Sequence, residues 1–406
     1  MSNILFLCIP SHGHVNPVLG LASELINQGE KITFFSSDEF KKSIEGIGAD
    51  FKCYKDDLNI FQKKNNVDEK PTSGLVSALL EPMKFIDDIL AQIKDLTFDY
   101  IVFSAAYPYA NVIAQVLQIP TISSFAVFMT MKDLMAKKTE EPQSFGKQGG
   151  FMGMNPEVIE AFKKVRQDLI QKYQVDVPEN MMNLFFNKGD LNIIYTSKYF
   201  APNPDQYDEN FIFIGPPVYN KKYEVYFPFE KLQGKKVIYI SLGTVFSNYS
   251  DEINKLFFKA FANLDAVVVM AAFNIDVSKF DIPENFIVRN YVPQMDILKH
   301  ATVAITHAGM NSIGDILYSN VPFVSIPLGA DQFFMANRAQ ELGATIVLDA
   351  KNLNAETLKK SIETVLENPD YLKNIKKINN SFIEAGGYKR AVEEIFKLKK
   401  RKGISN

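Results

Sequence analysis

The feature that most constrains the fold of this chain is an alternation of strand-like and helix-like segments that starts twice. Near the N-terminus, the apolar run NILFLCI (3–9) precedes an amphipathic stretch, PVLGLASELINQG (17–29), that ends in glycine. In the second half, KVIYISLGT (236–244) precedes the amphipathic DEINKLFFKAFANL (251–264). Strands that alternate with helices predict parallel sheets covered by helices on both faces. The chain is therefore predicted to form two doubly wound α/β domains.

The same alternation continues through each half. Further strand-like segments of the first half are KITFFSS (31–37), DYIVFS (99–104), PTISSFAV (120–127) and NIIYTS (192–197). Those of the second half are AVVVMAA (266–272), FIVRNYV (286–292), VAITH (303–307), PFVSIP (322–327) and ATIVL (344–348). Helical periodicity predicts helices over 354–366, 370–384 and 387–400.

A change of composition separates the two halves. The segment 215–236 is rich in Pro, Lys and Tyr and has no clear periodicity, which is typical of a linker. The chain of 406 residues is also long enough for two domains. We therefore predict domains over 1–215 and 236–386, a linker over 216–235, and a C-terminal helix with a basic tail over 387–406.

Composition and charge limit the classes of partner. A net charge of −3 gives no electrostatic reason to expect nucleic acid binding. No apolar run approaches the roughly 18 residues of a membrane-spanning helix. The first apolar run is short and lacks a basic flank, so a buried strand is expected rather than a signal peptide.

The only two cysteines, Cys8 and Cys53, cannot form a disulfide framework, so we expect a cytoplasmic protein. The sequence contains no C-x-x-C or H-E-x-x-H pattern, and no metal site is predicted.

The stretch VAITHAGMNSIGDIL (303–317) has the pattern of a phosphate-binding turn. A strand ends at His307, a small turn follows at Gly309, and a helix then begins. The free N–H groups at a helix start bind anions, and Asn311 and Ser312 add side-chain donors. Asp315 lies one turn further, where a carboxylate can accept hydrogen bonds from ribose hydroxyls. The alternative is an ordinary strand–turn–helix packing unit, and these residues alone favour neither interpretation.

Five short segments together carry a specific resemblance. GHVNP (13–17), SLGT (241–244), YVPQMDIL (291–298), THAGMNS (306–312) and GADQFFMANR (329–338) have the order and approximate spacing of the nucleotide-sugar glycosyltransferases of family one, which include macrolide and plant natural-product glycosyltransferases. The resemblance extends over nearly the whole chain. It implies two facing Rossmann-like domains of the GT-B type, an N-terminal domain for the acceptor and a C-terminal domain for the nucleotide sugar. It also implies a last helix that packs back on the N-terminal domain.

The resemblance implies a donor site as well. The diphosphate would be held by His307, Gly309, Asn311 and Ser312, with Thr244 assisting. Tyr291 stands where many members stack a tryptophan on uracil, and Val292 and Gln294 would meet the edge of the base. Asp315 replaces the usual ribose-binding glutamate, whereas Asp331 and Gln332 would bind the sugar hydroxyls. Without the other motifs, the last two residues would be interpreted as a solvated loop.

In this family the histidine of GHVNP is the general base that takes the proton of the acceptor hydroxyl, and that residue is His14 here. An imidazole with a pKa near 6.5 is matched to neutral pH. We expect His14 in the loop after the first strand, with Gly13 allowing a sharp turn. His12 is expected to pack or to cap a helix, and His300 is expected at the surface.

The segment DYIVFSAAYP (99–108) departs from the family pattern. Ser104 stands where the family usually has an aspartate that orients the catalytic histidine. A serine can accept a hydrogen bond from imidazole but cannot stabilise imidazolium with a full charge. Four explanations are open: acidic acceptors such as phenols, a substitute carboxylate, slow turnover, or a binding protein that has lost catalysis.

Two segments rich in Phe and Met, 123–135 and 181–186, could line an acceptor pocket or belong to the core. The acceptor contacts we predict are Phe125, Phe128, Met129 and Phe145. The basic tail KLKKRK (397–402) is expected to end a solvated helix, with weak attraction to an anionic membrane as the alternative.

Several enzyme classes lack support. The sequence has no G-x-G-x-x-G after the first strand, as a dinucleotide-binding oxidoreductase would, and no Asp-x-Asp, as a metal-dependent glycosyltransferase would. A nucleotide-sugar epimerase and a non-catalytic sugar-nucleotide-binding module stay open. We predict an inverting, metal-independent, monomeric glycosyltransferase without a further cofactor or stable membrane insertion. It would transfer a sugar, with glucose expected, from a UDP-sugar to a phenol, flavonoid, macrolide or similar acceptor, with dTDP as the alternative donor nucleotide.

Overall fold

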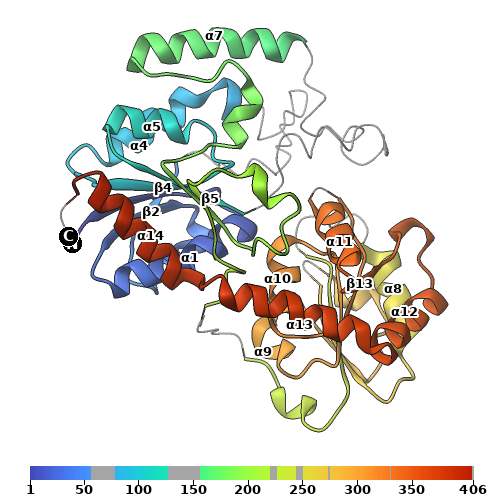
Figure 1. Cartoon of the computed structure of the whole chain (residues 1–406). Coiled ribbons are helices and arrows are strands. Elements are labelled where there is room, and N and C mark those ends of the chain that lie inside the picture. Colours follow the sequence, from blue (N-terminus) through green and yellow to red (C-terminus); the bar gives the residue numbers. More distant parts are fainter. Residues whose placement is uncertain are drawn as a thin grey trace.

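The computed structural model describes residues 1–55, 78–126, 156–219, 226–243, 250–272, 275–329 and 331–404. These residues form two sheets, each with helices packed on it (Figure 1). The first sheet has seven strands in the order β3-β2-β1-β4-β5-β6-β7, and the second has six in the order β10-β9-β8-β11-β12-β13. Every strand pair is parallel. The predicted fold class, two doubly wound α/β sheets, is confirmed.

The N-terminal sheet contains β1 (Asn3–Leu7), β2 (Lys31–Ser36), β3 (Asp50–Cys53), β4 (Tyr100–Ser104), β5 (Thr121–Phe125), β6 (Leu191–Ile194) and β7 (Phe211–Phe213). Its helices are α1 (His12–Asn27), α2 (Lys41–Glu45), α4 (Pro82–Gln92), α5 (Ala110–Leu117) and α7 (Pro156–Tyr173). Residues 4–7 of β1 are buried on both faces, which explains why this strand is an unbroken apolar run.

The C-terminal sheet contains β8 (Val237–Ser241), β9 (Val267–Ala271), β10 (Phe286–Arg289), β11 (Val303–Thr306), β12 (Phe323–Ser325) and β13 (Thr345–Val347). Its helices are α8 (Ser250–Phe261), α9 (Gln294–Leu298), α10 (Met310–Tyr318), α11 (Gln332–Glu341) and α12 (Ala355–Glu367). Short 3-10 helices lie at Asp38–Phe40, Met181–Phe185, Pro204–Gln206, Phe229–Leu232, Val277–Lys279 and Ala350–Asn352. We keep the domain and linker boundaries given above as a proposal.

The strand orders place the candidate site. The chain continues on one side of β1 with β2 and later crosses to the other side with β4, and β8 has the same relation to β9 and β11. Ligands of such sheets bind beyond the carboxyl ends of the strands at this switch point. The segment that follows β1 contains His14, and the segment that follows β11 contains His307.

The last two helices join the two halves. Helix α13 (Pro369–Glu384) packs on α10, and α14 (Gly387–Arg401) packs on α1 and β6 (Figure 1). Between them, Gly386 and Gly387 have φ angles of +87° and +61°, a conformation that glycine adopts without steric cost. The predicted return of the C-terminal helix to the N-terminal domain is confirmed.

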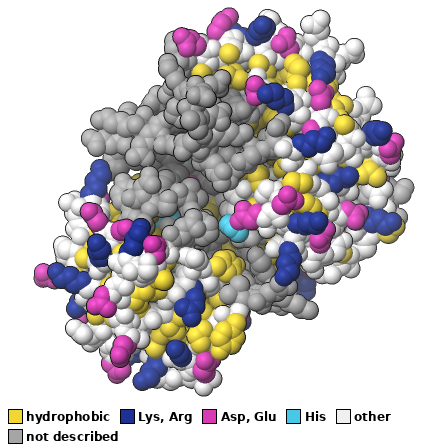
Figure 2. Space-filling view, turned by 180° about the vertical axis from the view of Figure 1, so that it is seen from behind, with side chains coloured by type: hydrophobic (Ala, Val, Ile, Leu, Met, Phe, Trp, Pro, Cys, Tyr) yellow, Lys and Arg dark blue, Asp and Glu magenta, His cyan; other side chains and the backbone are white. Residues whose placement is uncertain are grey.

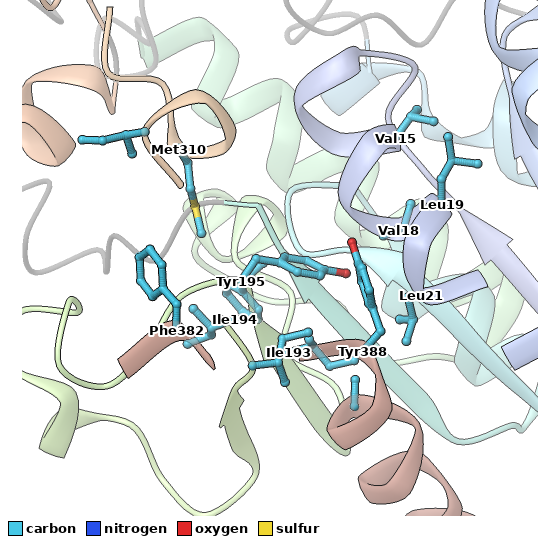
Figure 3. Packing of buried hydrophobic residues seen from close by; sticks show 14 of the residues in the cluster. Val15, Val18, Leu19, Leu21, Ile193, Ile194, Tyr195, Met310, Phe382 and Tyr388 are labelled. Carbon is cyan, nitrogen blue, oxygen red and sulfur yellow. The ribbon is translucent and has the colours of Figure 1, made fainter. Parts of the chain in front are cut away.

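Apolar packing also crosses the boundary. A single cluster of buried side chains contains residues of α1, β6, α10, α13 and α14. Figure 3 shows Tyr195, the residue after β6, beside Tyr388 of α14, while Met310 of α10 and Phe382 of α13 approach from the C-terminal domain; the ring centroids of the two tyrosines are 6.2 Å apart. The two halves of the chain therefore share one hydrophobic cluster.

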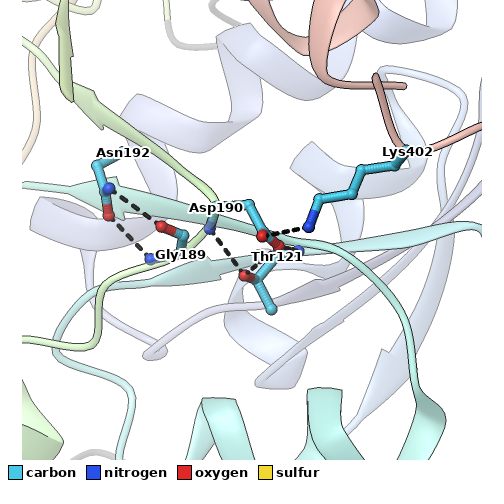
Figure 4. Close-up of polar contacts among 5 residues, drawn as sticks. All are labelled: Thr121, Gly189, Asp190, Asn192 and Lys402. Carbon is cyan, nitrogen blue, oxygen red and sulfur yellow. Dashed lines mark hydrogen bonds and ion pairs between the residues drawn. The ribbon is translucent and has the colours of Figure 1, made fainter. Parts of the chain in front are cut away.

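The basic tail is only partly solvated, and the expectation of a solvated helix end was wrong for Lys399. Lys399 Nζ lies 2.5 Å from Glu30 Oε1, and both side chains are almost fully buried. Glu30 Oε2 also accepts a hydrogen bond from the backbone N–H of Ser2 at 2.8 Å. Lys402 Nζ lies 2.6 Å from Asp190 Oδ1 (Figure 4). Lys399 is thus buried on a carboxylate of the N-terminal domain, whereas Lys397, Lys400 and Lys402 are exposed.

Asp190 is fixed on its other side by Thr121 (Figure 4). Its Oδ2 accepts hydrogen bonds from the backbone N–H and the hydroxyl of Thr121, at 2.8 and 3.0 Å. The hydrogen bond from Lys402 and those from Thr121 outweigh desolvation and lower the pKa of Asp190. None of the helices in the described ranges is long and apolar enough to cross a membrane.

Candidate active site

The first turns of α1 and α10 meet between the two sheets. The side chain of Asn311 on α10 donates a hydrogen bond through Nδ2 to the backbone oxygen of Gly13 on α1, at 3.3 Å. These two residues are 298 positions apart in the sequence. In Figure 2, histidine side chains lie near the middle of the face, and basic and acidic side chains are interspersed over the other described parts of this face. The contact brings the GHVNP and THAGMNS segments to one place.

His14 lies in a helix, and the predicted loop was wrong. Helix α1 begins at His12 because the extended Ser11 precedes it and its backbone oxygen accepts the N–H groups of His14 and Val15, at 3.0 and 2.9 Å. Gly13 is therefore helical and makes no sharp turn. The ring of His14 is partly exposed, yet desolvation lowers its pKa to about 4. The imidazole is thus neutral at pH 7 and a weaker base than the expected value near 6.5 implies.

His12, the first residue of α1, is held by Glu39 and Phe40. His12 Nε2 lies 3.0 Å from Glu39 Oε1, and the edge of its ring meets Phe40 at a centroid distance of 5.1 Å. The expectation that His12 packs is confirmed. His300 is exposed and its ring lies 5.8 Å from that of Phe229.

Ser104 at the end of β4 is fully buried beside Cys8 rather than open to solvent. Its Oγ lies 3.3 Å from Cys8 Sγ. Burial raises the pKa of the Cys8 thiol to about 12, so the thiol stays protonated and can donate to the serine. Within the described ranges, no hydrogen bond joins Ser104 to His14. The role of Ser104 at the position of the usual aspartate stays a prediction.

The ring of His307 is held between two glycines. A Cβ atom added at Gly309 would lie 2.5 Å from His307 Nε2, and one added at Gly243 would lie equally close to the same atom. Gly243 has a φ of +79°, whereas Gly309 has a φ of −60°, which any residue tolerates. The glycines of SLGT and HAGMNS are therefore needed to make room for the imidazole. Burial lowers the pKa of His307 to about 4, so this ring is also neutral at pH 7.

The start of α10 has the features of an anion-binding site. Ala308 adopts a left-handed conformation, with a φ of +62°, and Gly309 caps the helix without a side-chain hydrogen bond. The N–H groups of the first turn are therefore available for a ligand. Asn311 and Ser312 are partly exposed beside them, and Asn311 Oδ1 has no hydrogen bond to the described residues. Thr244 lies outside the described residues.

A hydrogen-bonded chain supports Asp315 on the same helix. Gln294 Nε2 donates to Asp315 Oδ2 at 2.6 Å, and the Tyr239 hydroxyl donates to Gln294 Oε1 at 2.8 Å. Burial raises the pKa of Asp315 to about 7, although the hydrogen bond from Gln294 opposes this shift. The side-chain oxygen of Gln294 is thus bonded to Tyr239, and its nitrogen is bonded to Asp315. The sequence did not predict that Gln294 holds Asp315. The ring of Tyr291 is 43% exposed, whereas the side chain of Val292 is buried and only its backbone can reach a ligand.

Gln332, the first residue of α11, holds the segment that precedes this helix by hydrogen bonds. This buried residue accepts hydrogen bonds at Oε1 from the N–H groups of Leu328 and Gly329, at 2.9 and 3.2 Å. Its oxygen is therefore used within the protein, and only its amide nitrogen is left for a sugar hydroxyl. Asp331 is partly exposed, and desolvation raises its pKa to about 6.

The predicted acceptor residues receive little support. Phe125 is buried and its ring packs against Phe211, with centroids 5.5 Å apart, so it belongs to the core. Phe128, Met129 and Phe145 lie outside the described residues. Met181, Leu184 and Phe185 are buried in the cluster on the α4 and α5 side of the N-terminal sheet. Of the two interpretations of segment 181–186, the core one is therefore favoured. Among the residues that the structure describes, no group of three or more His, Cys, Asp and Glu could hold a metal ion.

Comparison with known proteins shows the family to which this chain belongs. Residues 35–383 match the family model described as UDP-glucoronosyl and UDP-glucosyl transferase. The chain is 33% identical to a Bacillus subtilis (strain 168) protein named Uncharacterized UDP-glucosyltransferase YojK, over 99% of this chain and 98% of that protein. It is 23% identical to the oleandomycin glycosyltransferase of Streptomyces antibioticus, over 97% and 90% of the two chains.

Solved structures show the same fold. The glycosyltransferase of kitacinnamycin superposes with a TM-score of 0.78 at 22% identity, covering 97% of this chain and 98% of that one. The calicheamicin glycosyltransferase CalG4 gives 0.77 at 23% identity, covering 99% of both chains. The match to the family model and the 33% identity over almost the full length decide the assignment. This chain is an enzyme that belongs to the UDP-glucoronosyl and UDP-glucosyl transferase family.

Proposed function

We propose that the enzyme transfers a sugar, with glucose expected, from a UDP-sugar to a hydroxyl group of a small hydrophobic acceptor, with inversion and without a metal ion. The observation that carries the proposal is the contact between the first turns of α1 and α10. It brings a neutral imidazole, His14, toward a helix start suited to a diphosphate. The names of the relatives, UDP-glucosyltransferase and oleandomycin glycosyltransferase among them, support this donor and a natural-product acceptor.

On the donor side, the residues of α10 would act on the leaving group. The N–H groups after Gly309 and the ring of His307 would hydrogen-bond the diphosphate, and the helix dipole would offset its charge. Asp315 would accept hydrogen bonds from the ribose, while Tyr291 would stack on the uracil. Asp331 and Gln332 would bind the sugar hydroxyls. These contacts become stronger as negative charge develops on the departing UDP.

On the acceptor side, His14 would remove the hydroxyl proton. The acceptor oxygen forms a bond to the anomeric carbon from the face opposite the UDP, and the bond between that carbon and the phosphate oxygen breaks. The proton passes to His14 and then to solvent, and UDP leaves with the electron pair. One displacement of this kind inverts the configuration at the anomeric carbon.

The pKa of His14 restricts the acceptor. With a pKa of about 4, the ring is deprotonated at neutral pH but holds the acceptor proton weakly. A phenol, with a pKa near 10, is close enough in acidity for such a base to help. An aliphatic alcohol is several units less acidic and would react more slowly. The proposed acceptor is therefore a phenol or a similarly acidic hydroxyl.

The test is a screen of phenols and alcohols with UDP- and dTDP-sugars, read by mass spectrometry. His14→Ala should lower turnover by about 10²–10⁴ and leave UDP affinity nearly unchanged. His12→Ala is the matched control, because His12 is fixed by Glu39 and Phe40 and should leave turnover within about twofold. Wild-type turnover in His14→Ala would refute the general base, and loss of activity in EDTA would refute the metal-free mechanism.

A further inference from the structure

Pro17 occupies an unusual position, five residues after the first residue of α1. In a regular helix the N–H of residue 17 would donate to the backbone oxygen of residue 13. Proline has no N–H, and its ring crowds the carbonyl four residues earlier. The carbonyl of Gly13 therefore cannot receive its helical hydrogen bond.

The partner that occupies this carbonyl comes from the other domain. Asn311 Nδ2 donates to Gly13 O at 3.3 Å. The carbonyl of Ser11, two residues before Gly13, has its ordinary helical partner in the N–H of Val15. The interdomain bond thus falls on the carbonyl that Pro17 leaves without a helical donor.

The surroundings hold Pro17 in place. Its side chain is buried, and its own backbone oxygen accepts a hydrogen bond from the Tyr388 hydroxyl at 2.7 Å. The Tyr388 ring lies directly over Gly20 of α1, where an added Cβ would be 2.4 Å from ring atoms. Helix α14 therefore fixes α1 on one side of the proline, while the Gly13 carbonyl meets α10 on the other (Figure 3 shows Tyr388 beside α1).

We propose that Pro17 is a positioning residue for sugar transfer. By withholding an N–H from the Gly13 carbonyl, it reserves that carbonyl for Asn311 and holds the donor-binding start of α10 against the helical turn that carries His14. The link to catalysis rests on the proposed role of His14, but the link to domain geometry does not. Tyr388 and Pro17 together then determine how α1 faces the donor site.

The decisive experiment compares two replacements that both remove the ring. Pro17→Ala restores an N–H, whereas lactic acid introduced at position 17 by nonsense suppression has the same methyl group but an ester oxygen in place of the N–H. The alanine variant should lose about 3–10-fold in kcat/KM, the value of one hydrogen bond, with an unchanged or higher Tm, because alanine favours the helix. The lactic acid variant should stay within about twofold of wild type. Equal losses in both variants would refute the proposal.

Two further measurements separate this proposal from that for His14. Spin labels on α1 and α10 should report a broader interdomain distance in Pro17→Ala than in the lactic acid variant, also in a His14→Ala background that has no turnover. In an Asn311→Ala background, Pro17→Ala should have almost no additional effect on that distance. An additive effect there would contradict the proposed contact. Pro369→Ala is the matched control, because Pro369 is exposed at the first position of α13, where a missing N–H costs nothing.

Discussion

Gly309→Ala isolates the contribution of His307 to donor binding. The backbone at Gly309, with φ −60° and ψ 146°, is allowed for alanine, so the variant adds no backbone strain. The added Cβ would lie 2.5 Å from His307 Nε2, whereas ordinary contacts begin at 3.4 Å. The imidazole must therefore move by about 0.9 Å. Gly243 is also close to this ring, because a Cβ added there would lie 2.5 Å from the same nitrogen.

A displacement of this size should remove the hydrogen bond between His307 and the diphosphate. A hydrogen bond to a charged group contributes about 1.5–3 kcal/mol, which corresponds to roughly 10–150-fold in affinity. We expect Gly309→Ala to weaken UDP binding by about that factor, measured by isothermal titration calorimetry. The fold should be retained, as judged by circular dichroism, because the backbone at Gly309 tolerates alanine and the change is confined to one ring.

A double-mutant cycle provides the control. In a His307→Ala background the ring is gone, so Gly309→Ala should change UDP affinity by less than about twofold. If Gly309→Ala weakened binding equally in both backgrounds, the effect would come from the backbone of α10 and not from His307. Unchanged affinity in the wild-type background would show that His307 does not contact the diphosphate.

Three further changes test other parts of the structure. Asp315 is protonated below its raised pKa of about 7, so UDP affinity should increase as pH rises through 7, and Asp315→Asn should flatten this dependence in calorimetric titrations. Lys399→Met leaves Glu30 buried without its cation and should lower the free energy of unfolding by about 3–5 kcal/mol in urea titrations, with partial recovery when Glu30→Gln is added. Ser104→Asp should raise kcat/KM about tenfold on an alcohol, or 1.4 kcal/mol of barrier, and less on a phenol. An equal gain in Ser104→Asn would show that the carboxylate charge near His14 is not the cause.

The start of α1 shows where reasoning from local sequence reaches its limit. A proline is best tolerated in the first turn of a helix, and this rule predicts a start at Pro17. The helix instead begins at His12, and Asn311 binds the Gly13 carbonyl that the proline leaves without a helical donor. Eleven of the thirteen strands in the described ranges, by contrast, coincide with predicted segments, because a buried parallel strand is apolar throughout; β3 and β7 were not predicted. The compensating partner is 298 residues away, and no local pattern contains it.

The basic tail and Gln294 illustrate the same limit. A run of lysines indicates a solvated helix end. Lys399 is nevertheless buried, because it pairs with the buried carboxylate of Glu30, which lies 369 positions earlier in the chain. The family resemblance correctly marks YVPQMDIL as part of a nucleotide-sugar transferase, but it assigned Gln294 to the base. The structure shows Gln294 between Tyr239 and Asp315, where it holds a carboxylate. A motif identifies the segment, whereas the neighbours of each atom decide what that atom is free to bind.

Burial lowers the pKa of both imidazoles of the site, His14 and His307, to about 4. The consequence for the proposed base differs from that for the proposed diphosphate ligand. For His307, an approaching diphosphate favours the protonated ring, so donor binding itself would restore the charge that burial removes. For His14, the charge appears only when the acceptor proton arrives, and Ser104 is occupied by Cys8 and carries no charge to stabilise it. The leaving-group side is thus supported by glycines, a helix start and a titratable ring, whereas the base starts from a lowered pKa. The acidity of the acceptor should therefore limit turnover more than the departure of UDP does.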